Sequence, residues 1–187
     1  MTENNDTICA IATAPGVGGI AVIRISGPKA IEITGSIWKG KKLAEAATHT
    51  AHLGNIIDRE TNEVLDQGIA TVFRAPASFT GEDTVELSVH GSQWIQAQTI
   101  NLLIRNGCRL AQAGEFTRRA FASGKMDLTE AEAVADVIAA TSRASHRVAM
   151  SQMRGQFSQR LSTLRTQMLE LASLLELELD FSEEDVE

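Results

Sequence analysis

The stretch GEFTRRAFASGKMDLTEAEAVADVI, from Gly114 to Ile138, separates two regions with different hydrophobic periodicities. Before it, apolar residues alternate with polar ones, which is typical of half-buried strands; after it, they recur at steps of three and four, which is typical of amphipathic helices. Asp127 or Thr129 is a suitable N-cap for a helix that begins inside the stretch. The sequence therefore predicts an α/β domain over residues 1–122 and the first part of a helical domain over residues 123–187.

The first region has the pattern of an α+β fold, with short strands and two helices. In the segment from Thr84 to His90, strict alternation places Val85, Leu87 and Val89 on the buried side. A helix of about ten residues follows Pro28, a residue suited to a first helical position, and a second helix over residues 92–106 ends before Gly107. Further strands are expected at Thr7–Thr13, Ile20–Ser26, Ala51–Ile57, Gly68–Phe73 and Arg109–Gln112, with a turn over Asn62–Asp66.

The second region predicts long helices. One runs from Asp127 or Thr129 to about Met153, and Gly155 interrupts it. A heptad-like apolar seam then follows on a second long helix, and such a seam needs a partner helix to cover it. We therefore expect further helices beyond residue 187, so that the helical domain is incomplete here. The seam consists of Leu161, Leu164, Met168, Leu171 and Leu175.

Composition restricts the class of protein. Of the 187 residues 43% are hydrophobic, and the net charge is -7. This acidic balance argues against a broad nucleic-acid footprint, although it leaves room for a local basic patch. The polar N-terminus is unlike a signal peptide and no apolar run reaches about 18 residues, so a cytoplasmic protein without a membrane span is expected. Cys9 and Cys108 lack metal-type spacing and are expected to be small buried apolar side chains.

Two motifs near the N-terminus admit more than one interpretation. The glycines of Gly16–Gly19 suggest a phosphate loop, but the GxxxxGK[ST] pattern is absent, so a tight turn or a close backbone approach is favoured. Arg24 lies on a half-apolar strand face, where it needs either an anionic partner or a path to water. The pattern does not decide between these two alternatives for Arg24.

Four charged residues later in the chain are also ambiguous. Glu86 belongs to a solvated strand face, or it accepts two parallel hydrogen bonds from an amino-pyrimidine ring, a geometry that suits a carboxylate. Lys125 is an exposed lysine at the domain junction, or a point charge that contacts a carboxylate or phosphate. Arg118 and Arg119 are expected on a solvated helix surface rather than in a basic site. We identify no metal ligands and no catalytic group.

Four segments in the same order resemble one family. They are DTICAIATAPGVGGIAVIRISG, LDQGIATVFRAPASFTGEDTVELSVHG, the stretch from Gly114 to Ile138, and the closing LELDFSEED. Together they resemble the N-terminal part of the MnmE (TrmE) family of bacterial tRNA-modification GTPases. The resemblance extends over essentially the whole chain.

The resemblance implies an N-terminal domain similar to the tetrahydrofolate-binding domains of the glycine-cleavage T-protein type. Such a domain binds a one-carbon derivative of tetrahydrofolate, of the formyl or methylene type, and forms a homodimer. The folate-binding positions carried over are Arg24 of the RISG motif, Glu86 of the VEL strand after TGED, and Lys125 of the GK-x-DL motif. The chain departs from the family at Val17, often basic, and at residues 89–92, often GHGG.

The resemblance also implies what the whole protein does. A GTPase domain, with its GTP, magnesium and potassium, would follow the closing acidic motif and is not in this chain. With an FAD-dependent partner (MnmG/GidA), the protein would install an aminomethyl-type group at the wobble uridine of tRNA, with a one-carbon unit from the folate. This fragment alone is then not expected to be catalytic.

Two other functions stay open from the residues alone. The chain could be a structural dimerisation module whose seam from Leu161 to Leu175 drives association. It could also be an aminomethyltransferase-like enzyme that acts alone, which would require a catalytic group.

Overall fold

The computed structural model describes residues 6–184. The chain divides into two compact units, Met1–Lys125 and Met126–Glu187. The first unit combines a mixed sheet with helices, and the second is helical, as the α+β prediction requires. Asp185, at the end of the closing acidic motif, lies outside the described residues.

The first unit is built on a seven-stranded sheet with the order β3-β4-β5-β6-β2-β1-β7. Neighbouring strands are antiparallel, except that β1 and β7 are parallel. The chain therefore brings its N-terminal strands to the middle of the sheet, between the β4–β6 meander and the short strand β7. The strands are β1 (Ile8–Ile11), β2 (Ile20–Ser26), β3 (Trp38–Gly40), β4 (Thr50–Asp58), β5 (Glu63–Phe73), β6 (Thr84–His90) and β7 (Arg109–Leu110).

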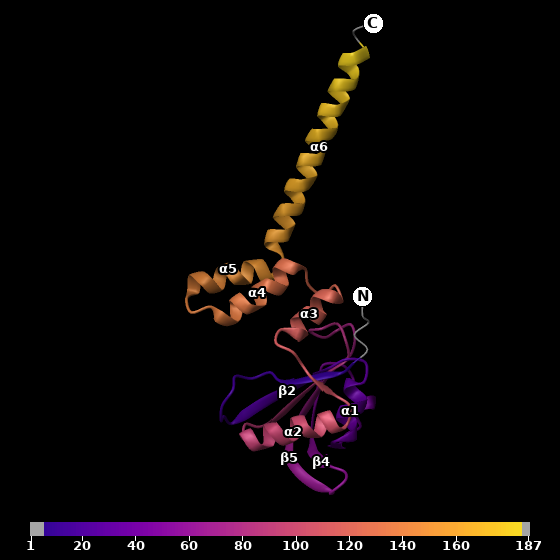
Figure 1. The fold of residues 1–187 in the computed structure, drawn as a ribbon, viewed down its shortest axis with the longest axis vertical. Coiled ribbons are helices and arrows are strands. Elements are labelled where there is room, and N and C mark those ends of the chain that lie inside the picture. Colours follow the sequence, from indigo (N-terminus) through magenta and orange to yellow (C-terminus); the bar gives the residue numbers. More distant parts are fainter. Residues whose placement is uncertain (1–5, 185–187) are drawn as a thin grey trace. The chain divides into compact units, whose positions relative to one another are not determined.

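Two helices of this unit, α1 (Ala30–Ser36) and α2 (Gln93–Arg105), share one apolar core with the sheet. Figure 1 shows α2 lying across the strands, and it contacts β1, β2, β5 and β6. A 3-10 turn, η1 (Leu43–Glu45), adds Leu43 to the core, and a third helix, α3 (Glu115–Ala122), follows β7. Because the core lies on one side of the sheet, alternate residues of β2, β5 and β6 point to the opposite face.

The most regular strand predictions are confirmed. β2 and β6 have the predicted bounds, and Val85, Leu87 and Val89 are buried. The turn predicted over Asn62–Asp66 is wrong, because β5 already begins at Glu63 and the turn occupies residues 59–62. Asn62 closes this turn with a φ of 58°, a left-handed conformation that asparagine tolerates.

The second unit contains α4 (Leu128–Ala139), α5 (Arg143–Met153) and α6 (Gln156–Glu184). Asp127 caps α4 as predicted: its Oδ1 accepts from the Glu130 amide at 2.8 Å, and Glu130 Oε2 accepts from the Asp127 amide at 2.8 Å. The break at Gly155, with a φ of 68°, is also confirmed.

A single helix from Asp127 to Met153 is wrong, since α4 ends at Ala139 and α5 begins at Arg143. The reason is local: the Ser142 hydroxyl accepts from the Ser145 amide at 3.1 Å and starts a new helix. α4 and α5 therefore pack against each other as a helical hairpin (Figure 1). On α6 the predicted seam lies exposed in this chain. Among residues 6–184, none of the helices combines the length and apolar character that crossing a bilayer requires.

Substitution of Gly27 tests the close packing of the chain around the end of β2. Its φ is 135°, and a Cβ there would lie 2.8 Å from both the Asp6 carbonyl oxygen and Thr7 Cα. We expect Gly27→Ala to lower the free energy of unfolding by about 3 kcal/mol, through backbone strain and the clash with the two residues that precede β1. Urea unfolding followed by circular dichroism measures the change.

Gly35→Ala is the matched control. Gly35 lies in α1, and a Cβ added there would have no neighbouring atom within 4 Å, so alanine should raise stability by about 0.5–1 kcal/mol. Equal effects of the two substitutions would contradict the packing described for Gly27.

Candidate functional site

The candidate site centres on an ion pair between Arg24 of β2 and Glu86 of β6. The two residues lie opposite each other in the antiparallel register. Nε and Nη2 of Arg24 lie 2.8 Å and 2.7 Å from Glu86 Oε1. The side chains are 25% and 26% exposed, so the pair is partly shielded yet open to a ligand. Of the two alternatives for Arg24, the anionic partner is present.

The two carboxylate oxygens of Glu86 have different environments. The hydrogen bond from Arg24 Nε and the ion-pair contact of Arg24 Nη2 both end on Oε1, and within the described part of the chain no donor is found for Oε2. A partly buried carboxylate oxygen without a donor can accept hydrogen bonds from a ligand. The arrangement therefore suits a ligand that presents an N–H group to Oε2.

Two aromatic rings flank the guanidinium of Arg24. Its Cζ lies 5.1 Å from the centroid of Phe79, in the β5–β6 loop, and 5.6 Å from that of Phe116, in α3. Such cation–π contacts stabilise the charge and restrict its orientation. Neither phenylalanine was predicted to belong to the site. The sequence offered one indication of such a role: the chain has only six phenylalanines, and these two lie in polar stretches.

Lys125 reaches the same loop from another side. Its amide donates to the Ala120 carbonyl at 2.9 Å, just beyond α3. A Cβ on Gly81 would lie 3.0 Å from Lys125 Cγ, so the lysine stem packs over that glycine. The β5–β6 loop is thus a common neighbour: Phe79 contacts Arg24, Gly81 contacts Lys125, and β6 with Glu86 follows the loop.

A buried ionic network lies beneath this arrangement and corrects one prediction. Arg119, expected on a solvated surface, is 1% exposed. Its Nη2 lies 2.7 Å from Asp6 Oδ1 and 3.1 Å from Glu115 Oε1, and its Nη1 lies 3.2 Å from Glu82 Oε1. The prediction failed because Glu115 and Arg119, four residues apart, both point inward from α3. Arg118 is exposed, as predicted.

The network connects the elements that carry the site. Glu82 accepts a hydrogen bond from Ser26 Oγ at 2.8 Å, and Ser26 also bonds with Thr80 at 2.7 Å. Glu115 is buried, and hydrogen bonds from Arg109 hold the pKa of its carboxyl at about 2, below the usual 4.5, although burial acts in the opposite direction. α3, the β5–β6 loop and the end of β2 are therefore fastened together.

Other motifs have structural explanations. The Gly18 amide donates to the Gly91 carbonyl at 3.2 Å, and Gln96 Nε2 donates to the same oxygen at 3.1 Å, which confirms the close backbone approach. Cys9 and Cys108 are buried, as predicted. Among residues 6–184, no cluster of three or more histidine, cysteine or acidic side chains is suited to hold a metal ion.

Both units match known protein families. Residues 7–125 match the family described as GTP-binding protein TrmE N-terminus, and residues 128–187 match the MnmE helical domain. The chain belongs to the MnmE family.

Several MnmE relatives match 98–100% of this chain. A tRNA modification GTPase MnmE of Christiangramia forsetii is 58% identical over 186 residues, which cover 98% of this chain and 39% of that protein. The protein of the same name from Bacteroides fragilis is 57% identical over 188 residues, and that from Cytophaga hutchinsonii is 53% identical over 187 residues. The chain spans about two-fifths of the length of these MnmE relatives.

The depressed pKa of Glu115 makes part of the stability dependent on pH. Because the folded-state value is about 2 and the ordinary value 4.5, the stabilisation is complete above pH 4.5 and is lost as the pH falls toward 2. We expect Glu115→Gln to lower the free energy of unfolding at neutral pH by roughly 3 kcal/mol. The difference from wild type should shrink as the pH falls.

Urea titrations from neutral pH down to about pH 3 test this expectation. Glu63→Gln removes an exposed glutamate at the start of β5 and is the control, which should change the free energy of unfolding only slightly. A difference between wild type and Glu115→Gln that stays constant over this range would contradict the role of the ionised carboxylate.

Proposed function

We propose that this chain is the folate-binding and homodimerising part of a GTPase that modifies the wobble uridine of tRNA. The observation that carries the proposal is the Arg24–Glu86 ion pair, partly exposed, with one glutamate oxygen lacking a donor within the described residues. The MnmE relatives, named tRNA modification GTPases, support the assignment of the whole protein.

Each residue of the site has a distinct role in this proposal. Glu86 accepts hydrogen bonds from the amino-pyrimidine part of a reduced pterin, since a carboxylate oxygen can accept from adjacent N–H groups. Arg24, oriented by Phe79, and Lys125 contact anionic or polar parts of the same ligand. A formyl- or methylene-type tetrahydrofolate would supply the one-carbon unit for the modification.

Further properties of the whole protein belong to the same proposal. The first unit would have the fold of T-protein-like tetrahydrofolate-binding domains. GTP hydrolysis with magnesium and potassium, the FAD-dependent partner MnmG/GidA, binding of tRNA, and a cytoplasmic location would be properties of the full-length protein.

The sheet face that carries the site supports homodimerisation. Leu53 pairs with Ile69, and Ile69 pairs with Ser88, two residues beyond Glu86, so these side chains share the face of the ion pair. Leu53 is 67% exposed and Ile69 is 42% exposed. Exposed apolar side chains on a sheet face favour burial against a second copy.

Calorimetric titration with 5-formyltetrahydrofolate tests the site. We expect about one ligand per wild-type chain, and a loss of affinity of at least about tenfold in Glu86→Ala, because a buried hydrogen bond to a charged group contributes roughly 1.5–3 kcal/mol. Arg24→Ala should also weaken binding.

Asp58→Ala is the matched control for this titration. Asp58, at the end of β4, accepts a hydrogen bond from Arg105 of α2, so its removal also breaks an arginine–carboxylate pair. Folate affinity should not change in this variant. Wild-type affinity in Glu86→Ala would contradict the site assignment.

Sedimentation velocity tests the proposed dimer. We expect Leu53→Lys combined with Ile69→Lys to shift the chain toward monomer, because both charges would be buried against the partner. Leu171→Lys combined with Leu175→Lys changes the α6 seam instead, and the dimer should persist. The opposite outcome would favour the alternative in which the seam drives association.

A further inference from the structure

Charge is strongly segregated in the second unit. Five arginines lie between Arg143 and Arg165, and no aspartate or glutamate occurs between Asp136 and Glu170. The whole chain has 24 acidic and 17 basic residues, so this stretch has the opposite sign to its surroundings. Such local segregation matters more for binding a polyanion than the net charge does.

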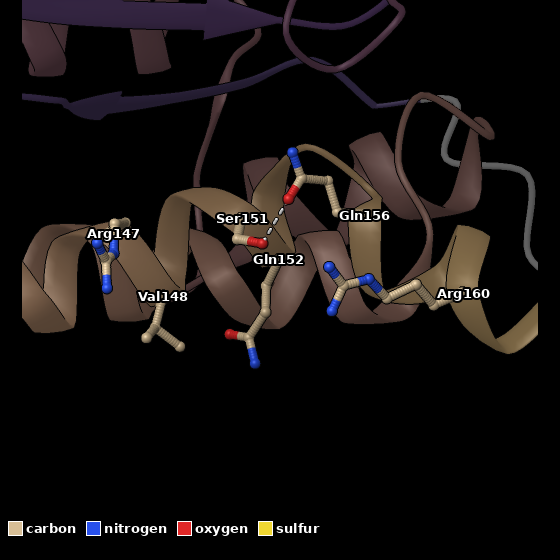
Figure 2. Close-up of a pocket in the computed structure, with 6 residues that line it drawn as sticks. All are labelled: Arg147, Val148, Ser151, Gln152, Gln156 and Arg160. Carbon is tan, nitrogen blue, oxygen red and sulfur yellow. Dashed lines mark hydrogen bonds between the residues drawn. The ribbon is translucent and has the colours of Figure 1, made fainter.

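Four of these arginines surround two adjoining hollows. Arg143 and Arg147, four residues apart, lie on one face of α5, and Arg154 is the C-cap residue that follows the last residue of this helix. Figure 2 shows Arg147 and Arg160, from α5 and α6, at opposite ends of one hollow of about 430 Å³. Arg143 and Arg154 line a second hollow of about 360 Å³, which shares Arg147 with the first. We call these four residues the arginine face.

The arginine face is available for a ligand. All four side chains are exposed, and within the described part of the chain none lies within ion-pair distance of a carboxylate. Of the acids on the neighbouring helix α4, Glu130 is engaged in the capping box with Asp127. The arginine face therefore lacks the internal neutralisation that Arg24 and Arg119 have.

The chemistry of the hollows fits a phosphodiester backbone. Arg143 and Arg147 are four residues apart and so follow the helix at about 6 Å, and Arg154 extends the row to roughly 16 Å. Guanidinium groups match phosphate oxygens with paired donors. Between Arg147 and Arg160, Ser151 Oγ donates to Gln156 Oε1 at 2.7 Å, which adds uncharged polar groups able to bond with ribose hydroxyls (Figure 2).

We propose that the arginine face binds the phosphate backbone of tRNA. The choice of tRNA as the polyanion rests on the proposed function, whereas the charge and geometry are properties of this chain. The contacts would position the RNA without reading its sequence.

Fluorescence anisotropy of a labelled, unmodified tRNA transcript tests the proposal on the whole chain, over about 50–200 mM salt. The test variant combines Arg143→Gln, Arg147→Gln, Arg154→Gln and Arg160→Gln. Its affinity should fall at least about tenfold, and the slope of log K against log salt should become shallower by about 3, since each phosphate contact contributes about 0.7–0.9.

The matched control combines Lys29→Gln, Lys39→Gln, Lys41→Gln and Lys42→Gln, four exposed lysines of the first unit. It removes the same charge, so an equal loss of affinity would attribute binding to net charge and overturn the proposal. Unchanged binding by the arginine variant would also overturn it. A polyglutamate peptide that competes as well as RNA would instead identify an acidic protein segment as the ligand.

Two further measurements keep the outcomes distinct. Circular dichroism checks that the variants fold. If the fourfold variant unfolds, two pairwise variants replace it, and each should show about half of the slope change expected for the fourfold variant. These are Arg143→Gln/Arg147→Gln and Arg154→Gln/Arg160→Gln. Titration of the fourfold variant with 5-formyltetrahydrofolate should give wild-type binding. Wild-type protein that binds tRNA through this face but no folate would refute the folate proposal alone.

Discussion

The first unit depends on one buried cation, the guanidinium of Arg119. Transfer of such a charge out of water costs several kcal/mol, and only well-placed anions offset this cost. Here the anions come from three segments: Asp6 before β1, Glu82 before β6, and Glu115 in α3 itself. Because charge-assisted hydrogen bonds have narrow geometry, the cation fixes the positions of these segments relative to one another.

The geometry of the candidate site follows from that constraint. Phe79 and Phe116 belong to the β5–β6 loop and to α3, the elements that Arg119 fastens together, and their rings restrict the guanidinium of Arg24. Arg24 is thereby held against a single oxygen of Glu86. A site with preset geometry loses less conformational entropy when a ligand binds. The buried network would therefore support ligand binding at the proposed site as well as the stability of the unit.

How far the sequence predicts this structure depends on the range of the interactions. β2 and β6 were predicted because alternation is a local pattern. The burial of Arg119 on α3 was not predicted, because this arginine finds an anionic partner in Asp6, 113 residues away. The pairing of Arg24 with Glu86 likewise requires the register between two distant strands. The family resemblance selected both residues without indicating that they contact each other.

The environment of each arginine, rather than its residue type, separates its possible roles. Arg119 is enclosed by carboxylates and has no exposure left for a ligand, so its role is structural. Arg24 has one partner and a quarter of its side chain exposed, which suits a ligand that joins the pair. Arg147 is exposed, with no carboxylate partner among the described residues, which suits a mobile and highly charged ligand. The net charge of -7 therefore does not describe these three local environments. Of the three, only that of Arg147 leaves an arginine charge that could contribute appreciably to binding RNA.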